Sequence, residues 1–199
     1  STGVPTKTEQ GDLWQALGAS QGDFERFIVA PKDALDAFRT IPELFNLVDK
    51  SQCPAIVITD LLISEGTFSV DPDDIDMHPS IDRGDVITEP RMDVSDLPTA
   101  PLSKNGHGNG LVGAPSNGYL RYENTDSGIS PRALPGLEGY VHVVASDEHD
   151  EDGVLLSDEY TNPHKRRMMV EKRARKFGNI ADQIAPPGLE GAEDAEVTL

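Results

Sequence analysis

Cysteine is nearly absent from this 199-residue sequence, which contains one thiol, Cys53. One cysteine excludes an internal disulfide, an iron–sulfur cluster and a structural zinc site built from this chain's own thiolates. Redox chemistry would therefore need a metal held by a partner. The sequence also has no run of about 20 apolar residues and no basic-then-apolar signal peptide. These two absences predict a soluble, cytoplasmic chain without a membrane partner.

Basic and apolar residues are also scarce. Lys and Arg number 17 against 35 Asp and Glu, giving a net charge of −18, which argues against nucleic acid as a partner. Both a halophilic protein of a high-salt cytoplasm and an acidic interaction protein would carry such a charge. Apolar residues make up 37%, below the roughly 45–50% that is usual for a globular domain. We expect a small ordered core with long loops.

The first 60 residues carry the strongest pattern of ordered structure. A short helix is expected after a possible cap at Thr8, with an apolar face formed by Leu13, Trp14, Ala16 and Leu17. A buried strand at 27–31 and a β-branched strand at 55–60 flank a helix at 33–50. The expected buried stripe of that helix comprises Ala34, Phe38, Ile41, Phe45 and Val48, and Pro42 should bend it. Strand, helix and strand together predict a parallel βαβ unit.

The rest of the chain is mostly polar and rich in Gly and Pro, which predicts loops. Weak strand patterns occur at 140–145 and 153–156. A helix is expected from Pro163, with a cap at Asn162, a stop at Gly178 and an apolar face of Val170, Ala174 and Phe177. Its segment 163–176 holds seven of the 17 bases and one acid. We expect this basic helix to pack on acidic neighbours rather than to bind phosphate.

Common catalytic motifs are missing: the sequence has no phosphate-binding P-loop, no dinucleotide fingerprint, no zinc-protease motif and no nucleophile elbow. His149 lies among four carboxylates and could bind a metal, but a solvated acidic turn is the preferred interpretation. The segment Pro5 to Asp12 is more informative. Lys7 and the hydroxyls of Thr6 and Thr8 lie in a loop that leads into a helix, where they could hold a substrate carboxylate. A capped helix with a surface lysine explains the same residues.

A family resemblance favours the carboxylate site. Its first part comprises Ser1 to Leu13, Val29 to Pro31, Phe45 to Leu47, Pro54 to Asp60 and Ile81 to Gly84. Its second part comprises Gly118 to Tyr122, Gly128 to Gly136, Glu148 to Gly153 and Met168 to Lys176. In this order, these segments resemble the alpha subunit of 2-oxoacid:ferredoxin oxidoreductases, especially the 2-oxoglutarate type. The Gly-rich stretch from Arg91 to Asn117 looks unlike the family.

The resemblance implies a thiamine diphosphate enzyme that decarboxylates a 2-oxo acid, passes electrons to ferredoxin and gives the acyl group to coenzyme A. In that family the position of Lys7 and its threonine neighbours contact the substrate carboxylate. The cofactor diphosphate, Mg²⁺ and the iron–sulfur cluster belong to the beta subunit. No catalytic residue and no metal ligand is expected within this chain, and its contacts with the cofactor, like the roles of Arg132 and His149, stay unassigned.

The expected fold class is α/β: a partial parallel-sheet thiamine diphosphate-binding domain of the pyrimidine type, then a loop-rich connector and a basic helix. The expected boundaries are residues 1–78 for the domain, 79–160 for the connector, 161–178 for the helix and 179–199 for an acidic linker or tail. The resemblance further implies a fragment, inactive alone, that lacks the N-terminal part and the second domain of the subunit. Two alternatives stay open: a non-catalytic acidic scaffold, and a flavodoxin-like regulatory module that binds an anion at Thr6 to Thr8.

Overall fold

A parallel βαβ unit forms the centre of the chain. The computed structural model describes residues 11–20, 22, 24–91, 119–140, 142, 148–151, 153, 163–184, 186 and 191–192. Strand β1 (Phe27–Val29), helix α2 (Ala34–Ser51) and strand β2 (Ala55–Val57) follow one another, and the two strands pair in parallel with Phe27 beside Ala55. The predicted strand–helix–strand unit is therefore confirmed.

Local chemistry sets both ends of α2. The side chain of Asp33 accepts a hydrogen bond from the Asp36 amide at 2.8 Å, which caps the helix N-terminus. Gln52 ends the helix in the left-handed conformation, with φ 53°, and thereby turns the chain toward β2. Pro42 lies inside α2, and the helix continues on both sides of it.

The core lies between α2, the sheet and the C-terminal helix. Phe27, Leu44, Cys53 and Ile180 are buried together. The predicted stripe of α2 was wrong in part, because Phe38 and Phe45 are 43% and 62% exposed. Leu44, with Leu47 and Val48 beside it, faces the sheet instead. Helix α2 has apolar residues on two faces, so periodicity alone did not identify the buried one.

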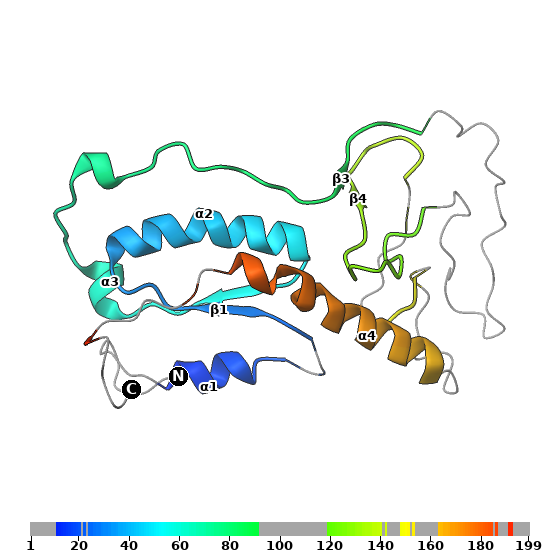
Figure 1. The fold of residues 1–199 in the computed structure, drawn as a ribbon, viewed down its shortest axis with the longest axis horizontal. Coiled ribbons are helices and arrows are strands. Elements are labelled where there is room, and N and C mark those ends of the chain that lie inside the picture. Colours follow the sequence, from blue (N-terminus) through cyan, green and yellow to red (C-terminus); the bar gives the residue numbers. More distant parts are fainter. Residues whose placement is uncertain are drawn as a thin grey trace.

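Helix α1 (Asp12–Leu17) is shorter and more exposed than the sequence suggests. Its N-cap is Gly11, so Thr8 is not the cap. In Figure 1, α1 and α2 lie on opposite sides of the strands. Ala16 is buried, whereas Trp14 is 79% exposed. The predicted apolar face of α1 is therefore mostly uncovered in this chain.

Six further elements complete the described structure: α3 (Leu61–Glu65), the 3-10 helices η1 (Pro72–Asp74) and η4 (Ala181–Gln183), strands β3 (Val86–Ile87) and β4 (Arg132–Ala133), and α4 (Pro163–Ile180). Strands β3 and β4 pair in parallel, and the sequence patterns did not predict them. Of the strands predicted at 140–145 and 153–156, Tyr140, His142 and Gly153 are described and are not in strands; the other residues lie outside the described part.

Helix α4 crosses the molecule from the 119–151 region to the core (Figure 1). It continues to Ile180, so the predicted stop at Gly178 was wrong. Its buried residues are Met169, Lys172 and Ile180, and the predicted apolar face was wrong in part, because Ala174 is exposed. Phe177 does reach the core, where its ring lies 4.8 Å from that of Phe27. Among the described residues, no helix is both long and apolar enough to cross a membrane.

A glycine sets the contact between α4 and the preceding loop, and this contact gives a first prediction. Gly128 has φ +78°, and a Cβ atom there would collide with the backbone oxygen of Lys172. Gly136 has a similar φ of +89° but open space around it. We expect Gly136→Ala to lower the free energy of unfolding by about 1 kcal/mol, from backbone strain alone. Gly128→Ala should cost a further ~1–3 kcal/mol because α4 must shift.

Chemical denaturation of the two variants measures this difference. Equal losses for Gly128→Ala and Gly136→Ala would show that the loop does not approach α4 as closely as described.

Candidate functional site

The residues predicted to bind a carboxylate, Thr6, Lys7 and Thr8, lie outside the described residues. Their segment leads into α1, which begins at Asp12. Helix α1 has six residues, so its dipole adds little to any anion site. The carboxylate site therefore stays a prediction that depends on the cation and hydroxyls of the loop itself.

What the structure does describe is a polar joint at the C-terminal end of α2, which we call the α2 joint. Its centre is Asp49, whose Oδ2 accepts a hydrogen bond from Arg83 Nη1 at 2.6 Å. Arg132 Nη2 lies 3.1 Å from Asp49 Oδ1 and donates to the backbone oxygen of Arg83 at 3.1 Å. One carboxylate thus holds two segments that are far apart in the sequence. Arg132, unassigned from the sequence, is a residue of this joint.

Asn46 and Lys50 extend the α2 joint on the same helix. Asn46 Nδ2 donates to the Ser80 oxygen at 2.8 Å, and Asn46 Oδ1 accepts from the Asp82 amide at 2.9 Å. Lys50 Nζ lies 2.8 Å from Asp82 Oδ2, and this hydrogen bond lowers the pKa of Asp82. Gly84 follows, where a Cβ atom would lie 2.8 Å from the Lys50 Cα. The segment 80–84 therefore fits closely against α2.

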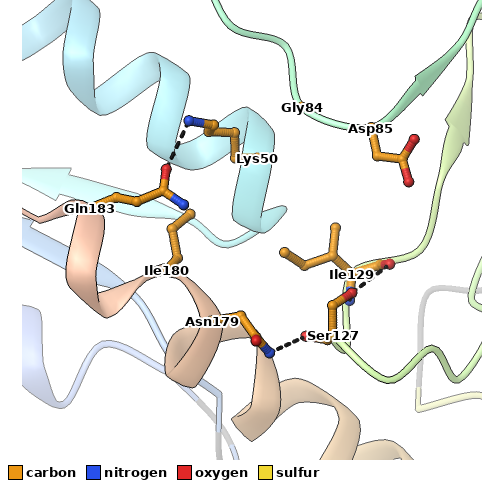
Figure 2. Close-up of a pocket in the computed structure, with 8 residues that line it drawn as sticks. All are labelled: Lys50, Gly84, Asp85, Ser127, Ile129, Asn179, Ile180 and Gln183. Carbon is orange, nitrogen blue, oxygen red and sulfur yellow. Dashed lines mark hydrogen bonds between the residues drawn. The ribbon is translucent and has the colours of Figure 1, made fainter.

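A shallow cavity of about 240 Å³ opens beside the α2 joint. Figure 2 shows its lining, which comprises Lys50, Gly84, Asp85, Ser127, Ile129, Asn179, Ile180 and Gln183. Lys50 Nζ donates to Gln183 Oε1 at 2.8 Å, and Asn179 Nδ2 donates to the Ser127 oxygen at 3.1 Å. These side chains mainly join α2, the 127–129 loop and the end of α4. The cavity is therefore space left between packed elements.

The segment 148–151 supplies carboxylate partners to three cations of the basic helix α4. Glu148 accepts hydrogen bonds from Arg166 Nε and Arg173 Nη2, both at 2.7 Å. Asp150 is 3% exposed and pairs with Lys165 at 2.9 Å. The expectation that this helix packs on acidic neighbours is confirmed. Burial raises the pKa of Glu148, but the two guanidinium hydrogen bonds outweigh it and hold the pKa below its usual value.

His149 has a packing role in the described structure. Its ring lies 3.8 Å from the Tyr122 ring, and its Nδ1 lies 2.9 Å from the Asp150 backbone oxygen. Within the described ranges, no three His, Cys, Asp or Glu side chains are grouped so that they could hold a metal ion. Of the four carboxylates around His149, Asp147 lies outside the described residues. The preferred interpretation of a solvated acidic turn was wrong for Asp150, which is 3% exposed.

Comparison with known proteins identifies the family, which the geometry alone does not. The family described as pyruvate flavodoxin/ferredoxin oxidoreductase, thiamine diphosphate-binding, matches residues 1–171. The chain belongs to this family. Its α/β fold with a small parallel sheet is accordingly that of a thiamine diphosphate-binding domain, as the resemblance implied.

Relatives with curated names agree with the family. The chain is 31% identical over 205 residues to the 2-oxoacid:ferredoxin oxidoreductase 2 alpha subunit of Aeropyrum pernix, and it covers 27% of that protein. It is 30% identical to the 2-oxoglutarate oxidoreductase subunit KorA of Mycobacterium tuberculosis, covering 26% of it. It is 24% identical to the 2-oxoglutarate synthase subunit KorA of Methanothermobacter thermautotrophicus, covering 44%. All of the chain aligns in each case, so it spans about a quarter to under half of these relatives.

Sequence reasoning missed Asp49. One pattern could have revealed it: an acidic residue in the last turn of a helix opposes the helix dipole and needs nearby cations. Asp49 lies two residues before the end of α2, and its cations, Arg83 and Arg132, both fall within family-like segments. Only the folded structure shows that both arginines contact Asp49.

The double contact of Glu148 gives a second prediction. We expect Glu148→Gln to lower the free energy of unfolding at pH 7 by about 1 kcal/mol, a value that allows for partial solvent screening. Because the pKa of Glu148 is lowered on folding, its contribution is present above the unfolded pKa and is lost as the pH falls through the folded pKa. The difference from the parent chain should therefore shrink as the pH falls below the unfolded pKa of about 4.3.

Glu171→Gln is the matched control, because Glu171 is exposed on α4 and should leave stability unchanged. Denaturation midpoints at pH 7 and pH 3 test both variants. A Glu148→Gln loss of the same size at pH 7 and at pH 3 would show that the charge on Glu148 does not stabilise α4.

Proposed function

We propose that this chain supplies the substrate-carboxylate site of a thiamine diphosphate-dependent 2-oxoacid:ferredoxin oxidoreductase. The reaction is the oxidative decarboxylation of a 2-oxo acid to an acyl-coenzyme A, with the electrons passed to ferredoxin. The observation that carries this proposal is the family match over residues 1–171, together with relatives named as alpha subunits of such enzymes. The partners are a beta subunit, ferredoxin, coenzyme A and the 2-oxo acid, and the location is the cytoplasm.

The proposal divides the chemistry between subunits. When bound, thiamine diphosphate would supply the nucleophilic chemistry needed to decarboxylate a 2-oxo acid. We assign its diphosphate, Mg²⁺ and the iron–sulfur cluster to the beta subunit. The single thiol of this chain, Cys53, lies buried in the core, where it suits packing rather than cluster ligation. The proposed mechanism therefore uses no metal bound by this chain.

The role of this chain's own residues is to bind and orient the substrate. In the proposed mechanism Lys7 donates a charge-assisted hydrogen bond to the substrate carboxylate, and the hydroxyls of Thr6 and Thr8 donate further hydrogen bonds. This contact places the keto carbon for attack. A cation on a loop can also release the group when it leaves as carbon dioxide. A rigid buried ion pair would hold the carboxylate and oppose that step.

We further propose 2-oxoglutarate as the preferred substrate. Two of the relatives are named for 2-oxoglutarate, whereas the 31% identical relative is named only for 2-oxo acids. Comparison of kcat/KM for 2-oxoglutarate, pyruvate and a branched 2-oxo acid tests this preference in the assembled enzyme.

Substitution of Lys7 provides the third prediction. In the assembled enzyme we expect Lys7→Ala to raise KM for the 2-oxo acid at least about tenfold, because a charge-assisted hydrogen bond contributes about 1.5–3 kcal/mol. Lys7→Arg should keep much of the activity, since a cation remains. Thermal stability should hardly change in either variant. Steady-state kinetics with ferredoxin as acceptor and a melting curve measure these effects.

Lys32→Ala is the control for loss of a surface cation, because Lys32 is exposed in the loop before α2. It should leave KM unchanged. If Lys7→Ala kept the parent kinetics but lowered the melting temperature, Lys7 would be structural and the site assignment would be wrong. Anion binding by the chain without any coupling to turnover would favour the flavodoxin-like regulatory module.

The acidic composition gives a fourth prediction under the halophilic hypothesis. A net charge of −18 produces self-repulsion that salt screens. We expect the assembled enzyme to lose activity and secondary structure as salt is lowered from molar concentration to about 50 mM, where the Debye length is longer. Circular dichroism and activity across this range test it, and constant values would reject the halophilic hypothesis.

A further inference from the structure

Lys172 places an ammonium group inside a junction of three segments. Its side chain lies on α4 and is 5% exposed, and its Nζ donates to Ser130 Oγ at 2.7 Å. Ser130 is 1% exposed, and its Oγ in turn donates to the Glu123 backbone oxygen at 2.8 Å. Gln52, the C-cap of α2, donates from Nε2 to the Ser130 backbone oxygen at 2.6 Å. The junction therefore connects α4, the 123–130 loop and α2 through polar contacts.

The charges that face Lys172 are mostly of its own sign. Lys176 and Arg173 lie on α4, Arg121 lies on the preceding loop, and Glu151 is the one carboxylate among the charges that act on it. In the described part of the chain, no carboxylate forms an ion pair with Lys172. Burial lowers the pKa of Lys172 to about 8, with the charges of Lys176 and Arg121 adding to the effect. Burial of the protonated Lys172 amine at this junction therefore costs free energy, and burial of the neutral amine costs less.

The same helix covers the single thiol of the chain. Cys53 is 6% exposed and lies in the core cluster with Ile180, the last residue of α4. Phe177 packs against this cluster, and Lys176 Nζ donates to the Gln52 backbone oxygen at 3.2 Å. Release of α4 would remove these groups and expose Cys53.

We propose that α4 is a proton-controlled strap: protonation of Lys172 favours release of α4 from α2 and from Cys53, and loss of that proton favours the docked helix. The geometric basis is a buried amine that donates a hydrogen bond to the buried hydroxyl of Ser130 and has three cations around it. In the released helix water would solvate the ammonium, which removes the penalty of its burial. This inference goes beyond the proposed function and does not depend on it.

The direction of the pH effect follows from linkage. The pKa of Lys172 is about 8 when α4 is docked and should return to about 10.4 when α4 is released. Between these values the released form binds more protons than the docked form, so docking strengthens as pH rises. Lys176 also has a pKa lowered by burial and would act in the same direction, so the experiment must separate the two lysines.

The rate of Cys53 modification measures this equilibrium in the assembled protein, where mass spectrometry of the Cys53 peptide separates it from any other thiol. The probe is 4,4′-dithiodipyridine at constant ionic strength, and each rate is divided by that of the denatured chain at the same pH. This division removes the ordinary effect of pH on thiol reactivity. Between pH 7.5 and 9.5 we expect the normalised rate to fall about tenfold or more.

Two substitutions of Lys172 set the slow and fast limits between which the normalised rate of the parent chain should vary. Lys172→Met has no proton to gain and should react slowly, keeping only the part of the pH dependence that comes from Lys176, whereas Lys172→Arg keeps its charge and should react fast across the whole range. Arg167→Met is the matched control, because Arg167 is exposed on the same helix, and it should keep the pH dependence of the parent. A parent rate independent of pH would overturn the proposal. The proposal would also be overturned if Lys172→Met kept the full pH dependence of the parent, because Lys176 would then be the group that titrates. Labelling as fast as in denaturant at every pH would overturn it as well.

Discussion

The described part of the connector is held in place mainly by the cations of α4. Tyr119 is the one large apolar side chain buried in the described parts of 119–153, so apolar burial cannot fix this region. Instead Lys165, Arg166 and Arg173 bond to carboxylates of the 148–151 segment. Arg175 bonds to Asn124 and to the Thr125 oxygen. A loop-rich region of a strongly acidic chain thereby gains its shape from one basic helix.

The strength of these contacts depends on where each lies. Pairs on the surface, such as Arg39 with Asp74 at 3.9 Å, contribute little in water and less in salt. The contact between Lys165 and the buried Asp150 is different, because removal of Lys165 would take a close cation away from a buried carboxylate. Lys172 has no such carboxylate partner among the described residues, and it is this imbalance that makes its proton important for docking. Thus one helix contains both stabilising charges and a destabilising one.

Sequence patterns located the βαβ unit but not the faces of its helices. The continuous apolar runs at 27–29 and 55–57 indicate buried strands. Helix α2 has apolar residues on two sides, and tertiary packing buries Leu44 rather than Phe45. Strands of two residues, such as β3 and β4, have no periodicity to detect. The α2 joint depends on contacts between residues more than 30 positions apart, which a local pattern cannot contain. The predicted carboxylate site came from a resemblance, and its three residues lie outside the described part.

The joint also changes what the family resemblance means. Asn46, Gly84 and Arg132 belong to segments that resemble the family, yet in the structure they hold the 80–84 segment and β4 against α2. Their residue types follow from geometry: an amide that can donate and accept at once, a glycine where backbones meet, and a guanidinium long enough to reach Asp49. Such positions would be required in any relative with this packing, whatever its substrate. Part of the likeness therefore reflects architecture, so resemblance in these segments is not by itself evidence for a particular 2-oxo acid.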